Sequence, residues 1–302
     1  MRIAIAQIDQ YDDPQRNLET VREGIRRAGA ADADLVVFPE ATMKAFGAGR
    51  LDTAAEPLDG PFASAVRAAA DEADVVAVLG MFRPADSVER DGKELNRVHN
   101  TLLAVGRGVD THYDKIRLFD AFGYRESDTV APGDRHVVVD VPVGTSGAGV
   151  GGDGVRRVAR VGLATCFDVR FPQHFQCLAA DGAEVLVLPA SWNDGPGKLA
   201  QWRTLTAARA LDTTCYVAAV DAARPGGPAK AGKPEGPTGI GHSAVIGPDG
   251  QIIAEAGYAP QFLVVDVDLD DLARVRREIP VLALLGSDPA VDGGAGEGGA
   301  RP

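Results

Sequence analysis

Val161-Gly-Leu-Ala-Thr-Cys166-Phe-Asp-Val-Arg170-Phe-Pro172 is the stretch around which the rest of the chain is organised. The apolar run Val158–Leu163 predicts a buried strand, and Pro172 with the polar residues before it predicts that the strand stops abruptly. Cys166 falls at the break, before a helix expected over 170–181. A side chain at such a break is held by rigid backbone and can face a cleft, which suits a nucleophile. Taken alone, the stretch allows equally well that Cys166 is a small buried apolar residue.

Length and composition indicate a globular chain. Its 302 residues are 45% hydrophobic and 25% charged, which is enough for a sizeable core. We expect one domain over 1–285, because no boundary leaves a core on both sides, and a disordered tail over 286–302, which is rich in Gly, Ala, Asp and Pro. The net charge of −12 argues against nucleic acid or an anionic membrane as a partner.

The cysteines and histidines predict neither a disulfide framework nor a metal site. There are three cysteines, no CxxC pair, and five scattered histidines. Cys177 and Cys215 are expected in the core. The N-terminal stretch turns polar too soon for a signal peptide, and no apolar run reaches transmembrane length. We therefore expect a reduced, cytoplasmic protein.

The order of elements predicts an α/β fold in which two mixed sheets lie face to face with helices outside. Strands are expected at 2–7, 35–39, 75–82, 99–105, 110–115, 136–141, 158–163, 184–189, 215–220, 241–246, 251–254 and 262–267. Helices are expected at 14–29, 62–74, 170–181, 198–213 and 269–278. Residues 145–154 are almost all small or polar and predict a flexible loop. Residues 224–237, rich in Pro, Gly and Lys, predict a mobile one that could fold over a pocket.

Three residues of complementary chemistry each lie at or just past the end of an expected strand: Glu40, Lys115 and Cys166. If those strands share one sheet edge, a base, a cation and a thiol converge there. Each residue also has an ordinary alternative, as a solvated carboxylate, an exposed strand-end lysine or a buried thiol.

Together the three would support hydrolysis of a carbon–nitrogen bond. Glu40 would take the thiol proton while the sulfur attacks a carbonyl or nitrile carbon. Lys115 and the backbone N–H of Phe167 would stabilise the developing oxyanion. Glu40 would then protonate the leaving amine and activate a water that releases the acid from the thioester.

The motifs around these residues resemble the nitrilase, or carbon–nitrogen hydrolase, superfamily. The matching stretches are Val36-Val-Phe-Pro-Glu40, Tyr113-Asp-Lys115-Ile-Arg-Leu-Phe119, Thr165–Pro172, Leu188-Pro-Ala-Ser-Trp192, Arg209-Ala-Leu211 with Tyr216-Val217, and Gly241-His-Ser243 with Pro248-Asp-Gly250. The resemblance covers the chain to about residue 280. It implies a Glu40–Lys115–Cys166 triad, a four-layer α-β-β-α sandwich, no metal or cofactor, and a homodimer or larger homo-oligomer.

Further site residues follow from the resemblance and its motifs. Glu126 matches a second family glutamate, which would orient Lys115 and the substrate amide, although a loop carboxylate is an alternative. Trp192 and Asn193 would line the pocket, with plain core as the alternative for Trp192. Arg170 could anchor an acidic substrate or pair internally with Asp168.

The stretches 118–134 and 166–172 resemble the amidases that act on ω-amides of α-keto acids and on deaminated glutathione. Such substrates carry carboxylates, so a pocket cation is expected; the candidates are Arg170, Lys44 and the basic loop 224–233. Nitrilases usually carry Trp-Glu directly after the cysteine, whereas here the pair is Phe167-Asp168. We therefore expect an amidase acting on a small, carboxylate-bearing amide. The alternatives are an N-carbamoyl amide hydrolase, an acyl transferase, and a catalytically silent binding subunit.

Overall fold

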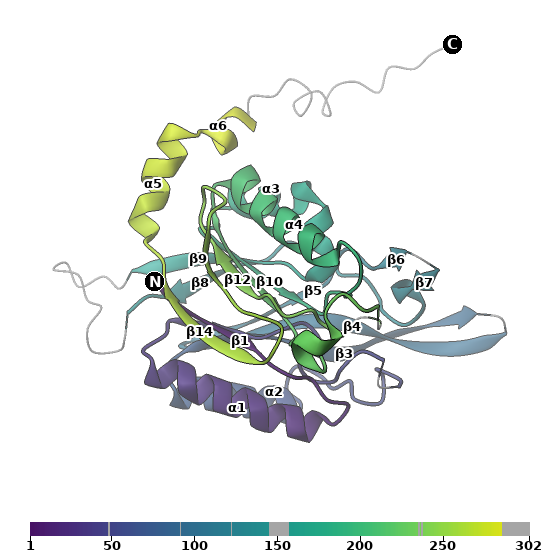
Figure 1. Ribbon diagram of the computed structural model, residues 1–302. Coiled ribbons are helices and arrows are strands. Elements are labelled where there is room, and N and C mark those ends of the chain that lie inside the picture. The colour runs from purple at the N-terminus through teal and green to yellow at the C-terminus, as the bar shows by residue number, and fades with distance from the viewer. Residues whose placement is uncertain are drawn as a thin grey trace, which may run out of the picture.

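Two six-stranded β-sheets face each other in the computed structural model, and helices cover both outer faces (Figure 1). The structure describes residues 1–285 except 48, 91, 122, 145–156, 235 and 237. The four layers follow the order α-β-β-α, which confirms the predicted fold class. Both the predicted flexible loop at 145–154 and the predicted tail at 286–302 lie outside the described residues.

The first sheet places Glu40 and Lys115 at one edge. Its strands, in spatial order, are β14 (Gln261–Asp266), β1 (Arg2–Gln7), β2 (Leu35–Val37), β3 (Val76–Arg90), β4 (Lys93–Gly106) and β5 (Val109–Asp114). β1, β2 and β3 are parallel, whereas β4 is antiparallel to both β3 and β5. Because the direction reverses twice, β5 runs parallel to β2. The residues that follow these two strands, Glu40 and Lys115, therefore emerge at the same end of the sheet.

The second sheet places Cys166 and Trp192 at one of its edges. Its strands, in spatial order, are β13 (Ile252–Glu255), β12 (Ala244–Ile246), β11 (Tyr216–Asp221), β10 (Val185–Ala190), β9 (Val158–Leu163) and β8 (Val138–Pro142). β9, β10 and β11 are parallel. The turns after β9 and β10, which carry Cys166 and Trp192, thus lie side by side.

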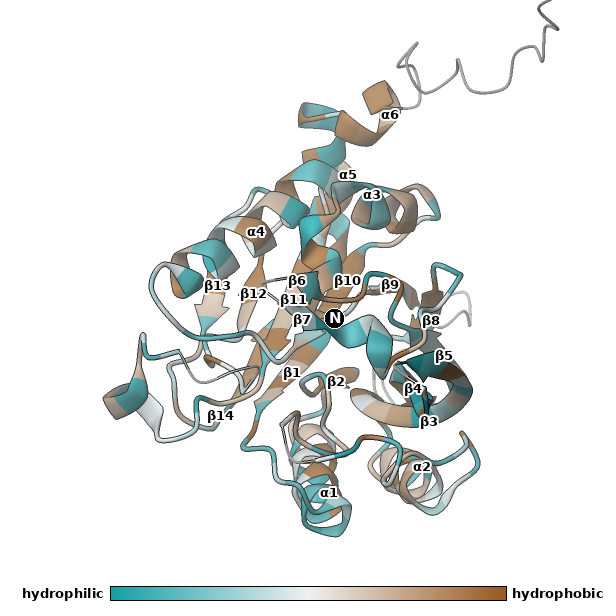
Figure 2. Cartoon of the chain, turned by 90° about the vertical axis from the view of Figure 1, so that its right-hand side faces the viewer, coloured by the Kyte–Doolittle hydropathy of each residue, from teal (hydrophilic) through white to brown (hydrophobic). Residues whose placement is uncertain are grey.

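The helices cover the sheets because the central strands are apolar on both faces. In β1, Ile3 and Ile5 point into the layer between the sheets, whereas Ala4 points toward the helices. Such strands read as continuous apolar runs, and they are hydrophobic along their length in Figure 2. The helices are α1 (Pro14–Ala30) and α2 (Pro61–Glu72) on the first sheet, α3 (Pro172–Ala180) and α4 (Lys198–Thr213) on the second, and α5 (Leu269–Glu278) and α6 (Val281–Leu285) toward the C-terminus.

The largest departure from the predicted elements is the hairpin of β3 and β4. Its pairing continues to Arg90 and Lys93, well beyond the predicted ends of the two strands. The outer part projects from the body as a two-stranded ribbon (Figure 1). Its side chains are exposed and partly charged, and Arg97 pairs with Asp86 across the ribbon. An exposed ribbon needs no apolar alternation, so the hydrophobic pattern gave no sign of it.

Five short elements lie in stretches that were predicted as irregular or as helix. Residues 119–134 contain β6 (Asp120–Ala121), β7 (Tyr124–Arg125) and the 3₁₀ turn η1 (Glu126–Asp128). The predicted helix at 170–181 begins at Pro172, which suits a first helical position, and the 3₁₀ turn η2 (Cys166–Arg170) precedes it. A third turn, η3 (Gly227–Lys230), lies in the segment 224–237. Within the described part of the chain, no helix is long and apolar enough to cross a membrane.

Candidate active site

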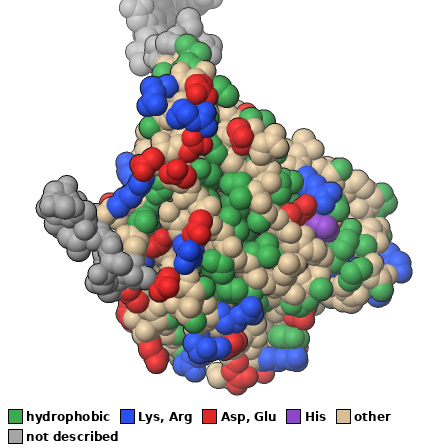
Figure 3. Space-filling view, turned by 60° about the vertical axis from the view of Figure 1, so that its left-hand side comes forward, with side chains coloured by type: hydrophobic (Ala, Val, Ile, Leu, Met, Phe, Trp, Pro, Cys, Tyr) green, Lys and Arg blue, Asp and Glu red, His purple; other side chains and the backbone are tan. Residues whose placement is uncertain are grey.

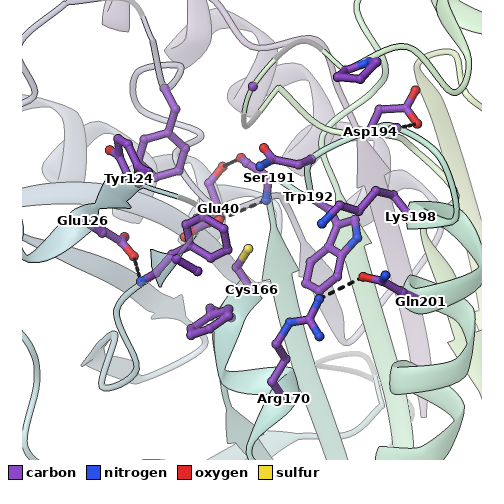
Figure 4. Close-up of a pocket in the computed structure, with 18 of the residues that line it drawn as sticks. Glu40, Tyr124, Glu126, Cys166, Arg170, Ser191, Trp192, Asp194, Lys198 and Gln201 are labelled. Carbon is purple, nitrogen blue, oxygen red and sulfur yellow. Dashed lines mark hydrogen bonds between the residues drawn. The ribbon is translucent and has the colours of Figure 1, made fainter.

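The ends of β2, β5, β9 and β10 meet at a cavity of about 600 Å³. All eight residues predicted for the site line it: Glu40, Lys115, Glu126, Cys166, Phe167, Arg170, Trp192 and Asn193. Figure 4 shows Glu40 and Glu126 on one side of Cys166, and Arg170, Lys198 and Gln201 on the other. Among the described residues, no three His, Cys, Asp or Glu side chains are arranged to hold a metal ion.

Cys166 occupies a strained position between a strand and a turn. It follows β9 by three residues and opens η2, and its φ of 46° lies in the left-handed region. That conformation is unusual for a residue with a side chain and is found where the surrounding structure fixes it, often at functional sites. The half-buried thiol therefore projects from a sharp bend into the cavity.

Lys115 is held between two carboxylates. Its Nζ lies 3.0 Å from Glu40 Oε1 and 3.0 Å from both carboxylate oxygens of Glu126. All three side chains are buried. Burial acts to lower the pKa of Lys115, but the nearby Glu126 and Glu40 outweigh it and hold that pKa well above its usual value. The Lys115 ammonium is therefore charged at neutral pH.

Glu40 is fixed on both oxygens. Oε1 accepts from Asn100 Nδ2 at 2.7 Å as well as from Lys115, and Oε2 accepts from the backbone N–H of Ser191 at 3.0 Å. Burial, and then the nearby Glu40, raise the pKa of the Cys166 thiol well above its usual value, while Lys115 acts to lower it. The resting site therefore holds a protonated thiol next to an ordered carboxylate.

Glu126 is more than a loop carboxylate. In addition to its contacts with Lys115, Glu126 accepts a hydrogen bond through Oε2 from the backbone N–H of Phe119, at 2.6 Å. Its side chain is 4% exposed. A buried carboxylate with these partners can orient the ammonium of Lys115 and leave Glu40 available for proton transfer.

Sequence reasoning missed two residues that order the site. Asn100 bridges the carboxylates of Glu40 and Glu126, at 2.7 and 3.4 Å. It lies within β4 between His99 and Thr101, so its polar side chain did not stand out from its neighbours in the sequence. Asp221 ends β11 and accepts the backbone N–H groups of Trp192 at 2.8 Å and Ile240 at 2.7 Å. It thereby holds the segment that carries Trp192 and Asn193 against the cavity.

The side of the cavity away from Glu126 is cationic and aromatic. Arg170 donates to Gln201 Oε1 at 3.0 Å, and its guanidinium lies 5.2 Å from the ring centre of Trp192. Lys198, the first residue of α4, lines the same wall. Burial, and then the positive charge of Arg170, lower the pKa of Lys198. Arg170 and Lys198 thus lie at the same wall, close enough for the charge of Arg170 to act on Lys198.

The structure decides between the alternatives for several predicted residues. Asp168 accepts from Tyr113, Thr165 and Arg117, and Arg170 is directed to Gln201 instead. Trp192 is 5% exposed and packs in the core, and it also lines the pocket. The expectation that Cys177 is buried was wrong: it lies exposed on α3, whereas Cys215 is buried just before β11.

Two of the three candidate cations for an acidic substrate do not face the cavity. Lys44 is buried and donates to the carbonyl oxygen of Asp12 at 3.1 Å. In the basic loop 224–233, Arg224 is buried against Asp194, with Nε 2.8 Å from Oδ2, and Lys230 and Lys233 are exposed. Arg170 is the candidate that lines the cavity.

The segment 224–237 forms part of the cavity wall. Its Pro234 and Gly236 line the cavity, next to Asp194, Gly195 and Pro196. Arg224 also donates to the carbonyl oxygens of Lys230 and Lys233, at 3.2 and 2.8 Å. The loop predicted to be mobile is therefore tied by a buried guanidinium over its described residues.

Comparisons with known proteins agree with this geometry. The carbon–nitrogen hydrolase family model matches residues 2–277. A protein named simply hydrolase in Mycobacterium tuberculosis is 47% identical over 289 residues, covering 93% of this chain and 94% of the relative. The deaminated glutathione amidase of Escherichia coli O157:H7 is 31% identical and covers 93% of this chain and 96% of the relative. The human omega-amidase is 29% identical, with 95% of each chain covered.

Solved structures show the same fold. The Nit3 protein of Saccharomyces cerevisiae, described as a member of branch 10 of the nitrilase superfamily, superimposes with a TM-score of 0.71 at 24% identity. The alignment covers 93% of this chain and 94% of that one. The family match over nearly the whole chain and the amidase relatives lead to one conclusion: the chain belongs to the carbon–nitrogen hydrolase family and is an amidase-like hydrolase.

Proposed function

We propose that this enzyme hydrolyses the amide of a small substrate that carries a carboxylate, through a thioester on Cys166, and releases ammonia or an amine. The observation that carries the proposal is the layout of the cavity: Glu40, Lys115 and the Cys166 thiol meet at one end, and Arg170 lines the other. The first end supplies the chemistry, and the second supplies a counter-charge for the substrate.

Acylation begins with the thiol protonated, because its pKa is raised in the resting site. Glu40 removes the proton as the sulfur bonds to the amide carbon. The amide oxygen becomes an oxyanion, which the Lys115 ammonium stabilises. The backbone N–H of Phe167 is a second donor, because the first N–H groups of a helical turn have no acceptor within the turn. Glu40 then gives its proton to the nitrogen, the carbon–nitrogen bond breaks, and the amine leaves.

Deacylation uses the same groups in reverse. Glu40, again a carboxylate, removes a proton from a water whose oxygen bonds to the thioester carbon. The carbon–sulfur bond then breaks, the sulfur recovers the proton from Glu40, and the acid leaves. Glu126 keeps the ammonium of Lys115 in place through both steps, since it contacts Nζ with both oxygens.

The cationic wall supports the proposed substrate class. Arg170 offers a planar donor suited to a carboxylate, and Lys198 adds a second positive charge beside it. The E. coli and human relatives are named deaminated glutathione amidase and omega-amidase, respectively. A carboxylate on the acyl part would therefore bind at Arg170 while the amide carbon reaches Cys166. We also propose a cytoplasmic location, since the three cysteines are free and the cytosol keeps thiols reduced.

The decisive experiment measures ammonia release together with the intact mass of the enzyme. The panel contains α-ketoglutaramate, deaminated glutathione, simple aliphatic amides, N-carbamoyl amino acids and a nitrile. We expect turnover of the first two and an acyl adduct on Cys166. Faster turnover of N-carbamoyl compounds would favour the alternative hydrolase. An adduct without release would indicate an acyl transferase, and no adduct with any compound would favour a silent binding subunit.

Variants assign the roles of the individual residues. Cys166→Ala should abolish turnover and adduct formation without loss of fold, whereas the exposed Cys177→Ala is the matched control and should behave like wild type. Glu40→Gln should impair both half-reactions. Lys115→Ala should lower the rate by at least about 10²–10³-fold, the usual effect of losing an oxyanion donor. Wild-type activity in any of the three would remove the role assigned to that residue.

A further inference from the structure

Asp168, two residues after Cys166, is a fully buried carboxylate that accepts hydrogen bonds from two separate parts of the chain. Oδ2 accepts from the hydroxyl of Tyr113 at 2.7 Å and from the backbone N–H of Thr165 at 2.8 Å. Oδ1 accepts from the backbone N–H of Arg117 at 3.0 Å. A buried carboxylate is stable only when its oxygens are hydrogen-bonded, so carboxylate and donors fix one another.

These donors surround the two reactive residues. Tyr113 lies two residues before Lys115 and Arg117 two residues after it. The Tyr113 hydroxyl also accepts the backbone N–H of Ile116 at 3.1 Å. On the other side, Thr165 and Asp168 enclose Cys166. Tyr113 is the last residue but one of β5 in the first sheet, whereas Thr165 follows β9 of the second sheet. One carboxylate therefore joins the strand end that carries Lys115 to the turn that carries Cys166.

We propose that Asp168 and Tyr113 are positioning residues that set the place of Lys115 relative to Cys166 across the gap between the two sheets. They act through the backbone on either side of the reactive residues. The inference builds on the proposed roles of Lys115 and Cys166, and it goes beyond them by naming what holds the two together.

The electrostatics of the pair support a stable link. Burial, and then the charge of Asp168, raise the pKa of Tyr113 well above its usual value, so the hydroxyl remains a donor throughout the working pH range. The imidazole of His174 packs edge-on against the ring of Tyr113, with 5.7 Å between the two ring centres. Burial lowers the pKa of His174, so at neutral pH it brings no charge that competes for Asp168.

The link should affect the reactivity of the thiol. Lys115 acts to lower the pKa of Cys166, against burial and Glu40. If the link loosens, Lys115 moves away and this opposing effect weakens. The pKa of Cys166 should then rise further, and the oxyanion should lose part of its stabilisation. A role in stability alone would produce neither change.

The test is Tyr113→Phe, which keeps the ring and removes the bridging hydroxyl. Tyr216→Phe is the matched control. The hydroxyl of Tyr216 donates to the carbonyl oxygen of Asp268 at 2.9 Å, and Tyr216 does not line the cavity. Both are made in a Cys177→Ser background, so that alkylation reports on Cys166. The measurements are kcat and KM for the best amide of the panel, and the rate of alkylation by iodoacetamide as a function of pH.

We expect Tyr113→Phe to lower kcat by about tenfold or more with KM within about twofold, as for misplaced catalytic groups. The midpoint of the alkylation profile should rise by about half a pH unit or more. Tyr216→Phe should change neither. Asp168→Asn, which keeps the volume but not both anionic oxygens, should act in the same direction and more strongly.

Unchanged kcat and alkylation in Tyr113→Phe would overturn the proposal, whatever happens to its thermal midpoint. A rise in KM alone would also overturn it, since that would make Tyr113 a substrate contact. The alkylation readout needs no amide substrate. It therefore still decides the proposal if the panel shows no turnover, and failure of the proposed function remains distinguishable from failure of the link. If Asp168→Asn does not fold, Tyr113→Phe decides alone.

Discussion

At the scale of single residues, Asn100 shows how closely the carboxylates of the site depend on each other. Its amide donates to both Glu40 and Glu126, which also share Lys115. Asn100→Ala should lower kcat by about tenfold to a hundredfold, the equivalent of one hydrogen bond to a charged group, with a smaller change in KM. Steady-state kinetics test this. Asn96→Ala is the control, because Asn96 is an exposed residue on the same strand that bonds to Asp52; equal losses in both variants would contradict the prediction.

Lys198 supplies a prediction about pH at the same scale. Its pKa is lowered by burial and then by Arg170, so it is a cation below that pKa and neutral above it. The KM for a carboxylate-bearing amide should therefore rise as the pH passes upward through the lowered pKa, whereas the KM for a neutral amide should stay flat. Lys198→Met should remove this dependence, and the exposed Lys233→Met should keep it. A pH-dependent KM that survives Lys198→Met would show that another group is responsible.

At the scale of elements, one ion pair ties the segment 224–237 to the cavity. Arg224 and Asp194 are 0% and 3% exposed, and Asp194 also accepts the backbone N–H of Gly232 at 2.9 Å. Arg224→Gln should destabilise the fold by about 3–5 kcal/mol, because it leaves a buried carboxylate without its cation. It should also raise KM, since Pro234 and Gly236 belong to the wall.

Denaturant unfolding and kinetics on the same samples measure both effects. The control is Arg203→Gln, which breaks the more exposed pair with Glu255 and should cost no more than about 1 kcal/mol. Loss of stability in Arg224→Gln with an unchanged KM would mean that the segment does not shape the substrate pocket.

At the scale of the whole molecule, the surface bears on assembly. One face carries hydrophobic side chains among interspersed acidic and basic ones (Figure 3). Exposed apolar side chains include Leu211 at the end of α4, and Ile252 and Ile253 in β13, at 47%, 43% and 47% exposure. Leu211 lies next to the turn at Gly250, so the ends of α4 and β13 adjoin. We propose that this region contributes to the homo-oligomer interface expected from the family resemblance.

Leu211→Glu should then shift the molecule toward a smaller species, as measured by light scattering after size-exclusion chromatography. Leu284→Glu, a substitution at another exposed leucine, serves as the control. A wild-type protein that is monomeric at micromolar concentration would contradict the proposed assembly, and an unchanged size in Leu211→Glu would exclude this region as its interface.

The sequence by itself determined the strand ends and the residue types that follow them. Apolar runs end just before Glu40 and Cys166, and the hairpin spacing around Gly106–Gly108 placed Lys115 at the end of a strand. The motifs around these residues identified the family. The order of strands and helices predicted two sheets face to face with helices outside, and the family resemblance implied the four-layer arrangement. These features are local in sequence, which is why periodicity and motif spacing reveal them.

Tertiary structure alone decided which groups meet. Asn100 reaches two carboxylates from the middle of a strand, and Asp168 turns from Arg170 toward Tyr113, because hydrogen bonds between distant segments have no signature in local sequence. Likewise, Lys44 turned away from the cavity and Arg224 became buried. The direction of a long side chain is set by the partner that compensates its desolvation, and that partner is brought near only when the two sheets pack.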